Sequence, residues 1–439
     1  MLSVADALNH ILEHARTKLP GEVALAEAVG LVLAEEVASD IDSPPHDKAM
    51  VDGYAVLSAD VVAGRAKLGV LEEITAGAVP TCKVIPGFCS RIMTGAPLPA
   101  GADAVVMVER TGFNPSPLTP LPQGARGILG TVEIHDERFR AGQNIMRRGK
   151  SLRQGETVLH SGVELGPAEI GLLAEVGHTQ IRAIPLVKMA MVSTGNELLP
   201  ADQKPTAGKI RNSNGPLLAA AAQRAGATPV DLGIVRDEPH ELRRCFRAGL
   251  ESDVLVISGG VSAGVLDLVP AVLVELGVRQ VFHKVDLKPG KPLWFGVCEK
   301  PLGDGSSNPK SNPRAEPGAN VGDRTLVFGL PGNPVSSLVC FELFVKPAIA
   351  RLAGRHWESP HPVRRAKLTR EFSQRSDRPT YYPALVVSSA EGLLAEPKAW
   401  QGSADLRGFA GANALLVFPA GEKIYAAGEA VDVLMLSTA

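Results

Sequence analysis

Apolar residues follow two different spacings in the second half of the chain, and their alternation predicts its fold. Short apolar runs, among them Leu186 to Val192 and Val254 to Ile257, have the length and aliphatic content of buried strands. Between such runs, helices are predicted from Asn214 to Ala225 and from His240 to Glu251. Strands that alternate with helices of this length form parallel βαβ units, so we expect a doubly wound α/β domain.

The first forty residues show a different pattern. Ser3 and Asp6 resemble a capping box, and apolar residues recur after them at helical spacing, so an amphipathic helix is expected at the start. A second short helix is predicted from Ala24 to Val29, because Gly30 follows it as a natural helix stop. A strand is predicted from Leu31 to Val37.

Short strands and turns begin at residues 43–45, a Ser-Pro-Pro sequence, and indicate a separate β-rich domain. Its later strands are predicted from Ser90 to Met93 and from Ala104 to Glu109, with a turn at residues 94–97 between them. Residues 111–127 are rich in Pro and Gly, so we expect a loop inserted in a hairpin.

The last eighty residues contain strand-like runs, such as Tyr381 to Val387 and Ala414 to Phe418, and predict a small β domain. Before them, residues 299–323 are poor in apolar residues and rich in Pro, Gly, Ser and Asn, which is typical of a flexible insertion. We expect this insertion and residues 111–127 to be disordered.

Two glycine-rich loops follow predicted strands at the edge where open α/β sheets bind ligands. In the first, Ser258-Gly259-Gly260-Val261-Ser262-Ala263-Gly264, the glycines let the backbone pass close to a ligand and leave amide hydrogens free to face an anion. This loop is either a phosphate cradle or only a tight strand-to-helix turn. The second loop, Leu330 to Ser336, has the same setting.

Charged residues are expected at the same edge. Lys288 and Lys291 belong to a turn stiffened by proline and glycine, while Glu197, Asp237 and Asp267 follow predicted strands. Lysines and amides bind phosphate oxygens directly, whereas carboxylates need a divalent cation between. Carboxylate ligands favour Mg2+ or Mn2+, so the set suggests metal-assisted attack on a phosphate or pyrophosphate. For any single carboxylate, a helix cap or a solvated face is the alternative.

Composition narrows the classes of partner. With a net charge of −2 over 439 residues, nothing global directs the chain to nucleic acid or an anionic membrane. The five cysteines are scattered without a Cys-x-x-Cys motif, which indicates a reducing cytoplasm and no structural zinc. No uncharged run approaches the roughly 18 residues of a membrane span, so we expect neither secretion nor membrane insertion.

Six motifs occur in a fixed order along nearly the whole chain and together resemble the molybdopterin molybdenumtransferase family, that is, MoeA and the gephyrin E domain. The motifs are Asp52-Gly53-Tyr54-Ala55-Val56, Met93-Thr94-Gly95-Ala96-Pro97, Ser193-Thr194-Gly195-Asn196-Glu197-Leu198, Ser258-Gly259-Gly260-Val261-Ser262, Lys288-Pro289-Gly290-Lys291-Pro292 and Leu330-Pro331-Gly332-Asn333-Pro334. Such an ordered set is far more specific than one glycine-rich loop.

The resemblance implies a homodimer of four-domain subunits, with a cleft completed by the partner subunit's β-rich domain. The expected fold is multidomain α/β and β. Its parts are an elongated N-terminal domain (residues 1–42 and 138–181), a β-rich inserted domain (43–137), a molybdopterin-binding α/β domain (182–357) and a small C-terminal β domain (358–439).

The resemblance also implies the reaction: adenylylated molybdopterin is hydrolysed with Mg2+, molybdenum is inserted from molybdate, and AMP is released. The implied catalytic residues are Asp52, Thr94, Glu197, Asp237, Asp267 and Lys291, with Glu197, Asp237 and Asp267 also holding the metal. The implied ligand-binding residues are Ser258, Gly259, Gly260, Ser262, Gly264, Lys288, Pro331, Gly332, Asn333, Pro334 and Ser403. Implied partners are molybdopterin adenylyltransferase and the apoproteins of molybdoenzymes.

The chain departs from the family pattern at two places. The family usually has Arg-Arg-Gly-Glu-Asp where this chain has Arg147-Arg148-Gly149-Lys150-Ser151. Ser151 thus replaces a carboxylate that the resemblance associates with the catalytic cleft, and Lys150 reverses the local charge. This change weakens cation binding or favours an anion, and the arginines mark either a solvated turn or an anion contact. The second departure is Asn196, at a position where aspartate is common in the family, and it is the milder change. Two alternatives therefore stay open: a degenerate homologue that acts as a pterin-binding scaffold, and a molybdopterin adenylyltransferase.

Overall fold

The computed structural model describes residues 1–115, 127–261, 268–299, 324–355 and 362–436. The chain forms two compact units. Unit 1 consists of Met1–Val23, Glu27–Ala34 and Arg182–Ala439, and unit 2 of Ala24–Ala26 and Glu35–Ile181. The four domains expected from the sequence divide the chain more finely, and their boundaries stay a prediction.

A six-stranded sheet lies at the centre of unit 1, in the order β17 (Ala227–Val235), β14 (Val187–Thr194), β18 (Val254–Ser258), β21 (Arg324–Leu330), β20 (Trp294–Glu299) and β19 (Arg279–His283). The first four strands are parallel, as predicted, while β20 and β19 add an antiparallel edge. Ser258 pairs with Ser193 on one side and Leu330 on the other, so three strands end side by side.

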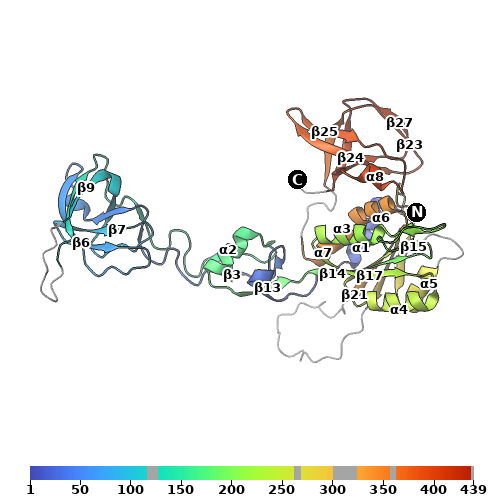
Figure 1. Cartoon of the computed structure of the whole chain (residues 1–439), viewed down its shortest axis with the longest axis horizontal. Coiled ribbons are helices and arrows are strands. Elements are labelled where there is room, and N and C mark those ends of the chain that lie inside the picture. Colours follow the sequence, from blue (N-terminus) through green and yellow to red (C-terminus); the bar gives the residue numbers. More distant parts are fainter. Residues whose placement is uncertain (116–126, 262–267, 300–323, 356–361, 437–439) are drawn as a thin grey trace, which may run out of the picture. The chain divides into compact units, whose positions relative to one another are not determined.

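Helices cover both faces of this sheet (Figure 1) and confirm the doubly wound α/β arrangement. One face packs against α1 (Val4–His14), α3 (Asn214–Arg224), α6 (Pro334–Cys340) and α7 (Lys346–Leu352). The other packs against α4 (Pro239–Gly249) and α5 (Leu268–Glu275). Successive residues of β14 alternate between the two cores, since Met191 belongs to the first and Val192 to the second.

Helix α1, which the sequence grouped with residues 1–42, packs against the α/β sheet. Its apolar face, with Ala7, Leu8 and Ile11 buried, packs into the first core of unit 1. The predicted capping box is present in part, because the Ser3 hydroxyl accepts a hydrogen bond from the Asp6 N–H at 3.1 Å. The sequence predicted the helix and its cap but not its packing partner.

The helical segment that follows the second glycine-rich loop is divided in the middle. Between α6 and α7 lies η4 (Phe341–Val345), a single π-helical stretch in which all five residues are buried. Within it, Glu342 is 3% exposed and forms ion pairs with Arg224 and Lys346.

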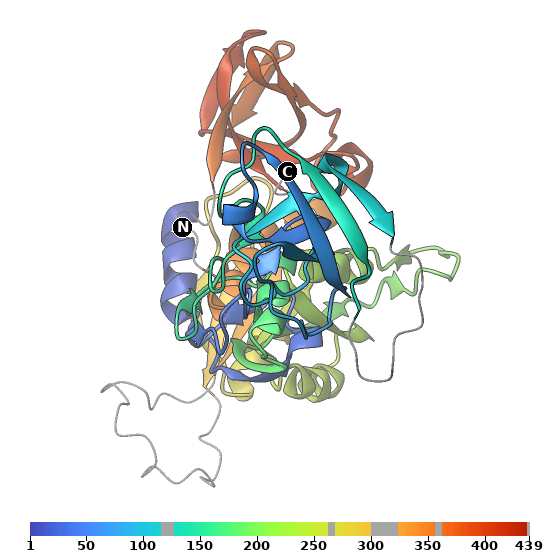
Figure 2. The same ribbon diagram turned by 90° about the vertical axis from the view of Figure 1, so that its left-hand side faces the viewer.

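The tail folds into a closed barrel, which confirms the predicted small β domain. Its strands follow the order β22 (Val363–Leu368), β25 (Gly392–Pro397), β24 (Thr380–Ser389), β26 (Ala414–Phe418) and β28 (Ala430–Met435). A two-stranded pair, β23 (Phe372–Ser376) and β27 (Gly421–Tyr425), and the short helix α8 (Leu406–Phe409) accompany it. In the view of Figure 2 this barrel forms the orange and red lobe of unit 1.

Unit 2 contains a second six-stranded sheet, in the order β8 (Ala104–Met107), β5 (Gly53–Val56), β7 (Phe88–Ile92), β6 (Arg65–Ile74), β10 (Gly130–His135) and β9 (Thr111–Pro115). One prediction was wrong here. Residues 111–115 are not loop, because they pair with β10; of the rest, 116–126 lie outside the described residues. The turn expected within residues 94–97 is present between β7 and β8, and β5 lies between these two strands in the sheet.

Smaller elements complete the fold, among them α2 (Pro167–Glu175) and the short 3-10 turns η2 (Ser58–Asp60) and η3 (Val108–Arg110). The short strands form one sheet of β1 (Gly21–Ala24), β13 (Gln180–Ile184) and β2 (Val32–Leu33), and the pairs β3 (Val37–Ala38) with β12 (Thr157–Leu159), β4 (Lys48–Ala49) with β11 (Ile145–Met146), and β15 (Leu198–Leu199) with β16 (Ile210–Arg211).

The helix predicted from Ala24 to Val29 is present only as the short 3-10 helix η1 (Leu25–Glu27), and Ala24 is the last residue of strand β1. The strand predicted from Leu31 to Val37 is split into β2 and β3. Both differences arise where tertiary pairing overrides a short local pattern.

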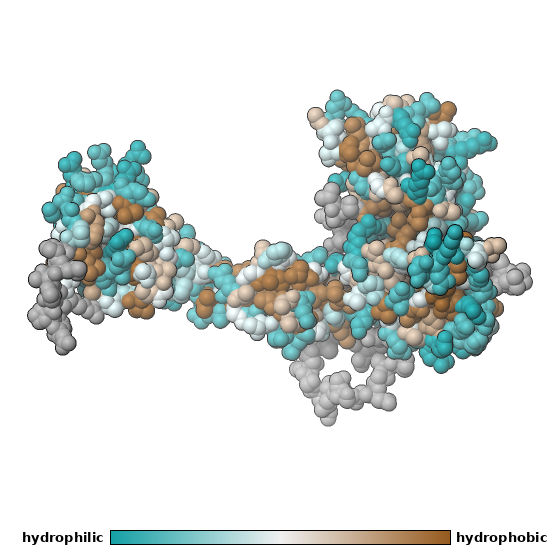
Figure 3. Space-filling model, in the orientation of Figure 1, coloured by the Kyte–Doolittle hydropathy of each residue, from teal (hydrophilic) through white to brown (hydrophobic). Residues whose placement is uncertain are grey.

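The surface of unit 1 around α4 is mainly hydrophilic (Figure 3), as expected for a helix that buries only Leu242, Phe246 and Gly249. Among the described residues, no helix has both the length and the apolar character to cross a membrane.

Candidate functional site

A cavity of about 700 Å3 lies in unit 1, where loops at the edge of the α/β sheet meet the barrel. Five of the site residues predicted from the sequence line it: Lys288, Lys291, Pro331, Asn333 and Ser403. The barrel and its neighbouring strands contribute side chains that the sequence did not single out, namely Phe372, Arg375, Arg378, Tyr382 and Trp400. The lining contains four basic side chains and no carboxylate, so an anionic ligand fits it.

The lysine turn, residues 288–292, is held rigidly. The backbone N–H of Lys288 donates to Pro379 O at 2.9 Å, and the Tyr381 N–H donates to Lys288 O at 2.9 Å. Gly290 has a φ of +126°, and a Cβ there would lie 2.6 Å from the buried Cys340 Sγ. Only glycine fits, so the backbone that presents both ammonium groups is fixed by packing.

The second loop, after β21, is tied to both the barrel and the sheet. Asn333 Nδ2 donates to Ser403 Oγ at 2.9 Å, and the Val335 N–H donates to Ser403 O at 3.0 Å. From the sheet side, Asn214 Nδ2 donates to Gly332 O at 2.7 Å and to Ser258 Oγ at 2.6 Å. Asn214 therefore joins the two glycine-rich loops, and sequence analysis missed it, although an Asn-Gly pair opens its helix.

Ser403 is positioned in turn by Asp405. This carboxylate accepts hydrogen bonds from the Gln401 N–H at 2.9 Å and the Gly408 N–H at 3.1 Å. These two bonds, the Gln401 bond first, lower the pKa of Asp405 below its ordinary value. The carboxylate thus stays ionised at neutral pH and holds the loop that carries Ser403.

The glycines of the first loop are required by close packing. Gly259 and Gly260 have φ of +99° and +63°, and a Cβ on Gly259 would lie 2.5 Å from Thr194 O. A Cβ on Gly260 would lie 2.9 Å from Thr194 Oγ1, a buried hydroxyl without a hydrogen-bond partner in the described structure. The glycines are therefore explained as a tight turn, and their role as a phosphate cradle stays a prediction. Ser262, Gly264 and Asp267 lie outside the described residues.

Of the predicted metal ligands, Glu197 and Asp237 lie in neighbouring loops. The Asp237 N–H donates to Asn196 Oδ1 at 3.3 Å, and the Gly195 N–H donates to Val235 O at 3.2 Å, so the loops after β14 and β17 are joined. Glu197 is exposed and Asp237 is half-buried.

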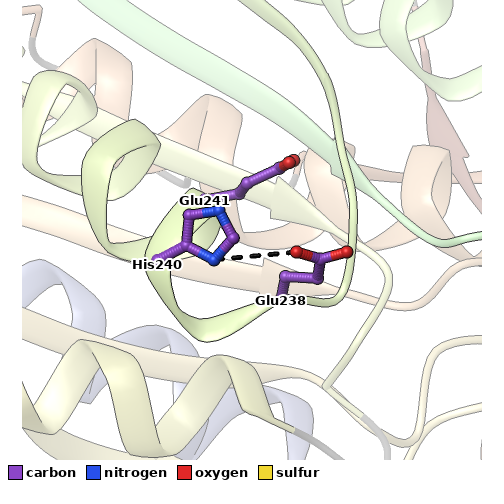
Figure 4. Close-up of side chains that lie close together, drawn as sticks. All are labelled: Glu238, His240 and Glu241. Carbon is purple, nitrogen blue, oxygen red and sulfur yellow. Dashed lines mark ion pairs between the residues drawn. The ribbon is translucent and has the colours of Figure 1, made fainter.

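Within the described ranges, the one cluster of potential metal ligands consists of other residues. Glu238, His240 and Glu241 at the start of α4 have ligand atoms within 4.8 Å of one another (Figure 4). Figure 4 also shows the 3.6 Å ion pair between His240 Nδ1 and Glu238 Oε2. The structure does not include Glu197 or Asp237 in this cluster.

Asp52 and Thr94, two of the catalytic residues that the resemblance implies, contact each other within unit 2. Asp52 Oδ1 accepts hydrogen bonds from both the backbone N–H and the hydroxyl of Thr94, each at 2.7 Å. The backbone bond and then the hydroxyl bond lower the pKa of Asp52. The pair presents an ionised carboxylate on the exposed turn before β5.

Known proteins match the chain along nearly its whole length. Residues 2–177 match the family model of the MoeA N-terminal region (domain I and II), residues 190–351 that of a probable molybdopterin binding domain, and residues 365–436 that of the MoeA C-terminal region (domain IV).

Individual relatives agree with the family models. A molybdopterin molybdenumtransferase of Bacillus subtilis is 33% identical over 94% of this chain and 89% of its own length. One from Staphylococcus epidermidis is 30% identical over 99% and 95%. A crystal structure of a molybdopterin biosynthesis MoeA protein from Pyrococcus horikoshii covers 100% of both chains, with a TM-score of 0.74 and 29% identity.

Proposed function

The chain belongs to the MoeA family, and from this membership we propose that it inserts molybdenum into adenylylated molybdopterin, a late step of molybdenum cofactor biosynthesis, with Mg2+-dependent release of AMP. The cavity of unit 1 carries the proposal, because it presents Lys288 and Lys291 opposite the contact between Asn333 and Ser403. Two ammonium groups on a rigid turn suit the phosphate oxygens of an adenylylated pterin and the oxygens of molybdate.

Each loop has a separate task in this proposal. Lys288 and Lys291 bind oxyanions, while Pro331 lines the cavity, Pro334 begins the following helix and Ser403 donates a hydroxyl hydrogen bond. Arg375 and Arg378 also line the cavity, each in an ion pair, with Glu422 and Asp377 respectively. With these cations and no lining carboxylate, the cavity favours the charged end of the substrate over a neutral pterin.

Glu197 and Asp237 are proposed to hold Mg2+, with Asp267 as a third ligand. Their oxygen donors fit a hard divalent cation, and the loops of Glu197 and Asp237 are joined by the Asp237–Asn196 hydrogen bond. When bound, Mg2+ would neutralise charge on the phosphate oxygens and so favour departure of AMP. The ionised Asp52, held by Thr94, is proposed as the catalytic carboxylate contributed by unit 2.

The test is a measurement of AMP release from adenylylated molybdopterin by the purified chain, with Mg2+ and molybdate each added or withheld. Release should need Mg2+, respond to molybdate, and fall at least about a hundredfold in Lys291→Ala, which removes a charge from the substrate's binding site. Lys83→Ala, a change of an exposed lysine in unit 2, is the control and should leave the rate unchanged. If ligand binds but no AMP is released, the scaffold alternative replaces the proposal. Pyrophosphate release from ATP would support the adenylyltransferase alternative.

A homodimer is part of the proposal, with each cleft completed by the partner subunit's β-rich domain. Mixing two inactive variants, Asp52→Ala and Lys291→Ala, tests this arrangement. A mixed dimer then has one cleft with both residues intact, so activity should return on subunit exchange. Activity that stays absent although mixed dimers form would refute a shared cleft. We also propose a cytoplasmic location, since all five cysteines are unpaired.

A further inference from the structure

A second pocket, of about 370 Å3, lies within unit 2 on the loop between β11 and β12. It is lined by the segment Arg147–Ser151 together with Arg153 and Glu156. Four of these side chains are basic and one is acidic, in a chain whose net charge is −2. The family resemblance has the Glu-Asp of the catalytic cleft where this chain has Lys150 and Ser151, and the function proposed above assigns no role to these two residues.

Two of the arginines form the frame of the pocket. Arg147 Nη1 lies 2.6 Å from Asp47 Oδ2, and Arg148 Nε lies 2.6 Å from Asp42 Oδ2. The same aspartates brace the backbone, because Asp47 accepts the Arg148 N–H at 2.8 Å and Asp42 accepts the Gln154 N–H at 3.0 Å. These carboxylates thus hold the two ends of the loop in place and form ion pairs with Arg147 and Arg148, while Arg153 lies close enough to Asp42 to contribute to lowering its pKa.

The turn itself is fixed by its backbone. The Lys150 N–H donates to Arg147 O at 3.1 Å, and Gly149 between them has a φ of +66°. The Gly149 and Ser151 N–H groups donate to Pro44 O and Ser43 O at 3.0 and 2.9 Å. Since these amides are occupied, the side chains must supply any contact to a ligand.

Two cations of the lining make no side-chain hydrogen bond or ion pair within the described ranges, although the charge of Arg153 acts on nearby Asp42. Neither the Lys150 ammonium nor the Arg153 guanidinium makes a hydrogen bond or ion pair there, and both residues are exposed. The Ser151 hydroxyl likewise has no partner in that part of the chain. The single lining carboxylate is already engaged, because Glu156 Oε2 accepts the Arg153 N–H at 3.0 Å.

We propose that this pocket binds a tetrahedral oxyanion, either free or as the phosphoryl group of a larger molecule. An ammonium, a guanidinium and a hydroxyl offer more donors than the two oxygens of a carboxylate ligand accept, whereas a tetrahedral dianion accepts them all. The volume is at the small end of the usual range of about 300–1,000 Å3 for ligand pockets, which suits a compact anion. This inference does not rest on the proposed insertase reaction, because anion binding is measured without it.

The experiment titrates the full-length chain with inorganic phosphate and with molybdate at low ionic strength, by isothermal titration calorimetry. The Lys288→Ala/Lys291→Ala variant serves as the parent protein, because it weakens anion binding in the cavity of unit 1. Adding Lys150→Ala and Arg153→Ala should weaken binding of these oxyanions at least about tenfold, since two charge-assisted hydrogen bonds are lost. Lys150→Glu should abolish it.

A matched control separates a site from general charge attraction. Lys83→Ala/Arg110→Ala removes the same two charges from other exposed positions of unit 2 and should change the dissociation constant less than twofold. An equal loss in the control, or an unchanged affinity in Lys150→Ala/Arg153→Ala, would overturn the proposal.

The two sources of the anion are distinguished by comparing inorganic phosphate with AMP, and AMP with adenosine. Binding of inorganic phosphate that depends on Lys150 and Arg153 identifies a free oxyanion as the ligand. If only AMP shows that dependence, the ligand is a phosphoryl group on a larger molecule. If neither anion, nor molybdate, shows it, the proposal fails.

Discussion

Replacing Gly290 by alanine should destabilise unit 1 and displace the two lysines that flank this residue in the cavity. At a φ of +126°, Gly290 adopts a conformation that is rare for residues with a side chain. An added Cβ would lie 2.6 Å from Cys340 Sγ and 2.8 Å from Leu287 Cδ2. Cys340 and Leu287 are both 0% exposed, so neither can move aside into solvent.

The size of the effect follows from two contributions. A strained backbone conformation costs about 1–3 kcal/mol. Forcing a methyl group into a packed core costs about 1–3 kcal/mol more, so the free energy of unfolding should fall by about 2–6 kcal/mol. Gly421→Ala is the matched control, because Gly421 has a similar φ of +130° but nothing within 4 Å of its added Cβ. It should lose only the first contribution.

Tryptophan fluorescence during guanidinium unfolding measures both variants. Of the three tryptophans of the chain, Trp294 and Trp400 lie in the described part of unit 1, and the residues of unit 2 include no tryptophan, so the signal does not report on unit 2. Gly290→Ala should also cost less in a Cys340→Ala background, where the nearest obstructing atom is gone. If Gly290→Ala costs no more than Gly421→Ala, or if the cost is the same in both backgrounds, packing against Cys340 is not the reason for this glycine.

Three further outcomes are expected. Thr94→Val should raise the pKa of Asp52, measured by NMR titration, because Asp52 loses one of its two hydrogen bonds. In the unchanged protein the pKa of Asp52 is below the ordinary aspartate value of about 3.9, and the stability that this difference contributes is fully present above pH 3.9. That stability is lost as the pH falls through the lower pKa of the folded state. Asn214→Ala should cost about 1–3 kcal/mol in tryptophan-monitored unfolding, because Gly332 O and Ser258 Oγ lose their donor, and a cost near zero would contradict this role. Asp405→Ala should speed hydrogen exchange at the Gln401 amide, measured by mass spectrometry, while unchanged protection would show that other contacts hold the loop.

The α/β half of the fold could be predicted because its local and global signals agree. The strand expected from Val254 to Ile257 is β18, one residue longer, and the helix expected from Asn214 to Ala225 is α3, one residue shorter. Where signals were short, pairing with distant strands decided the structure. Residues 111–115 look like loop from their Gly and Pro content, yet β10 supplies their hydrogen bonds.

The candidate site could be predicted only where the residues of a local motif determine the conformation of the backbone. The Lys288–Pro292 turn and the loop after β21 are marked by glycine and proline at strand ends, and both line the cavity. Phe372 and Trp400 line the same cavity without any local pattern, because closure of the barrel brings them there. The ligand roles of all these residues remain predictions.

The hydrogen bonds between the lysine turn and strand β24 have a consequence for how such proteins can be recombined. Sequence families divide this chain between residues 351 and 365, as if the barrel were an exchangeable module. Yet backbone hydrogen bonds connect the two sides of that division, because Lys288 forms them with Pro379 and Tyr381. A chimaera that takes the barrel from a relative must therefore inherit the lysine turn from the same parent. Otherwise the chimaera loses the hydrogen bonds between the lysine turn and the barrel, and the backbone that carries the two ammonium groups is no longer held in place.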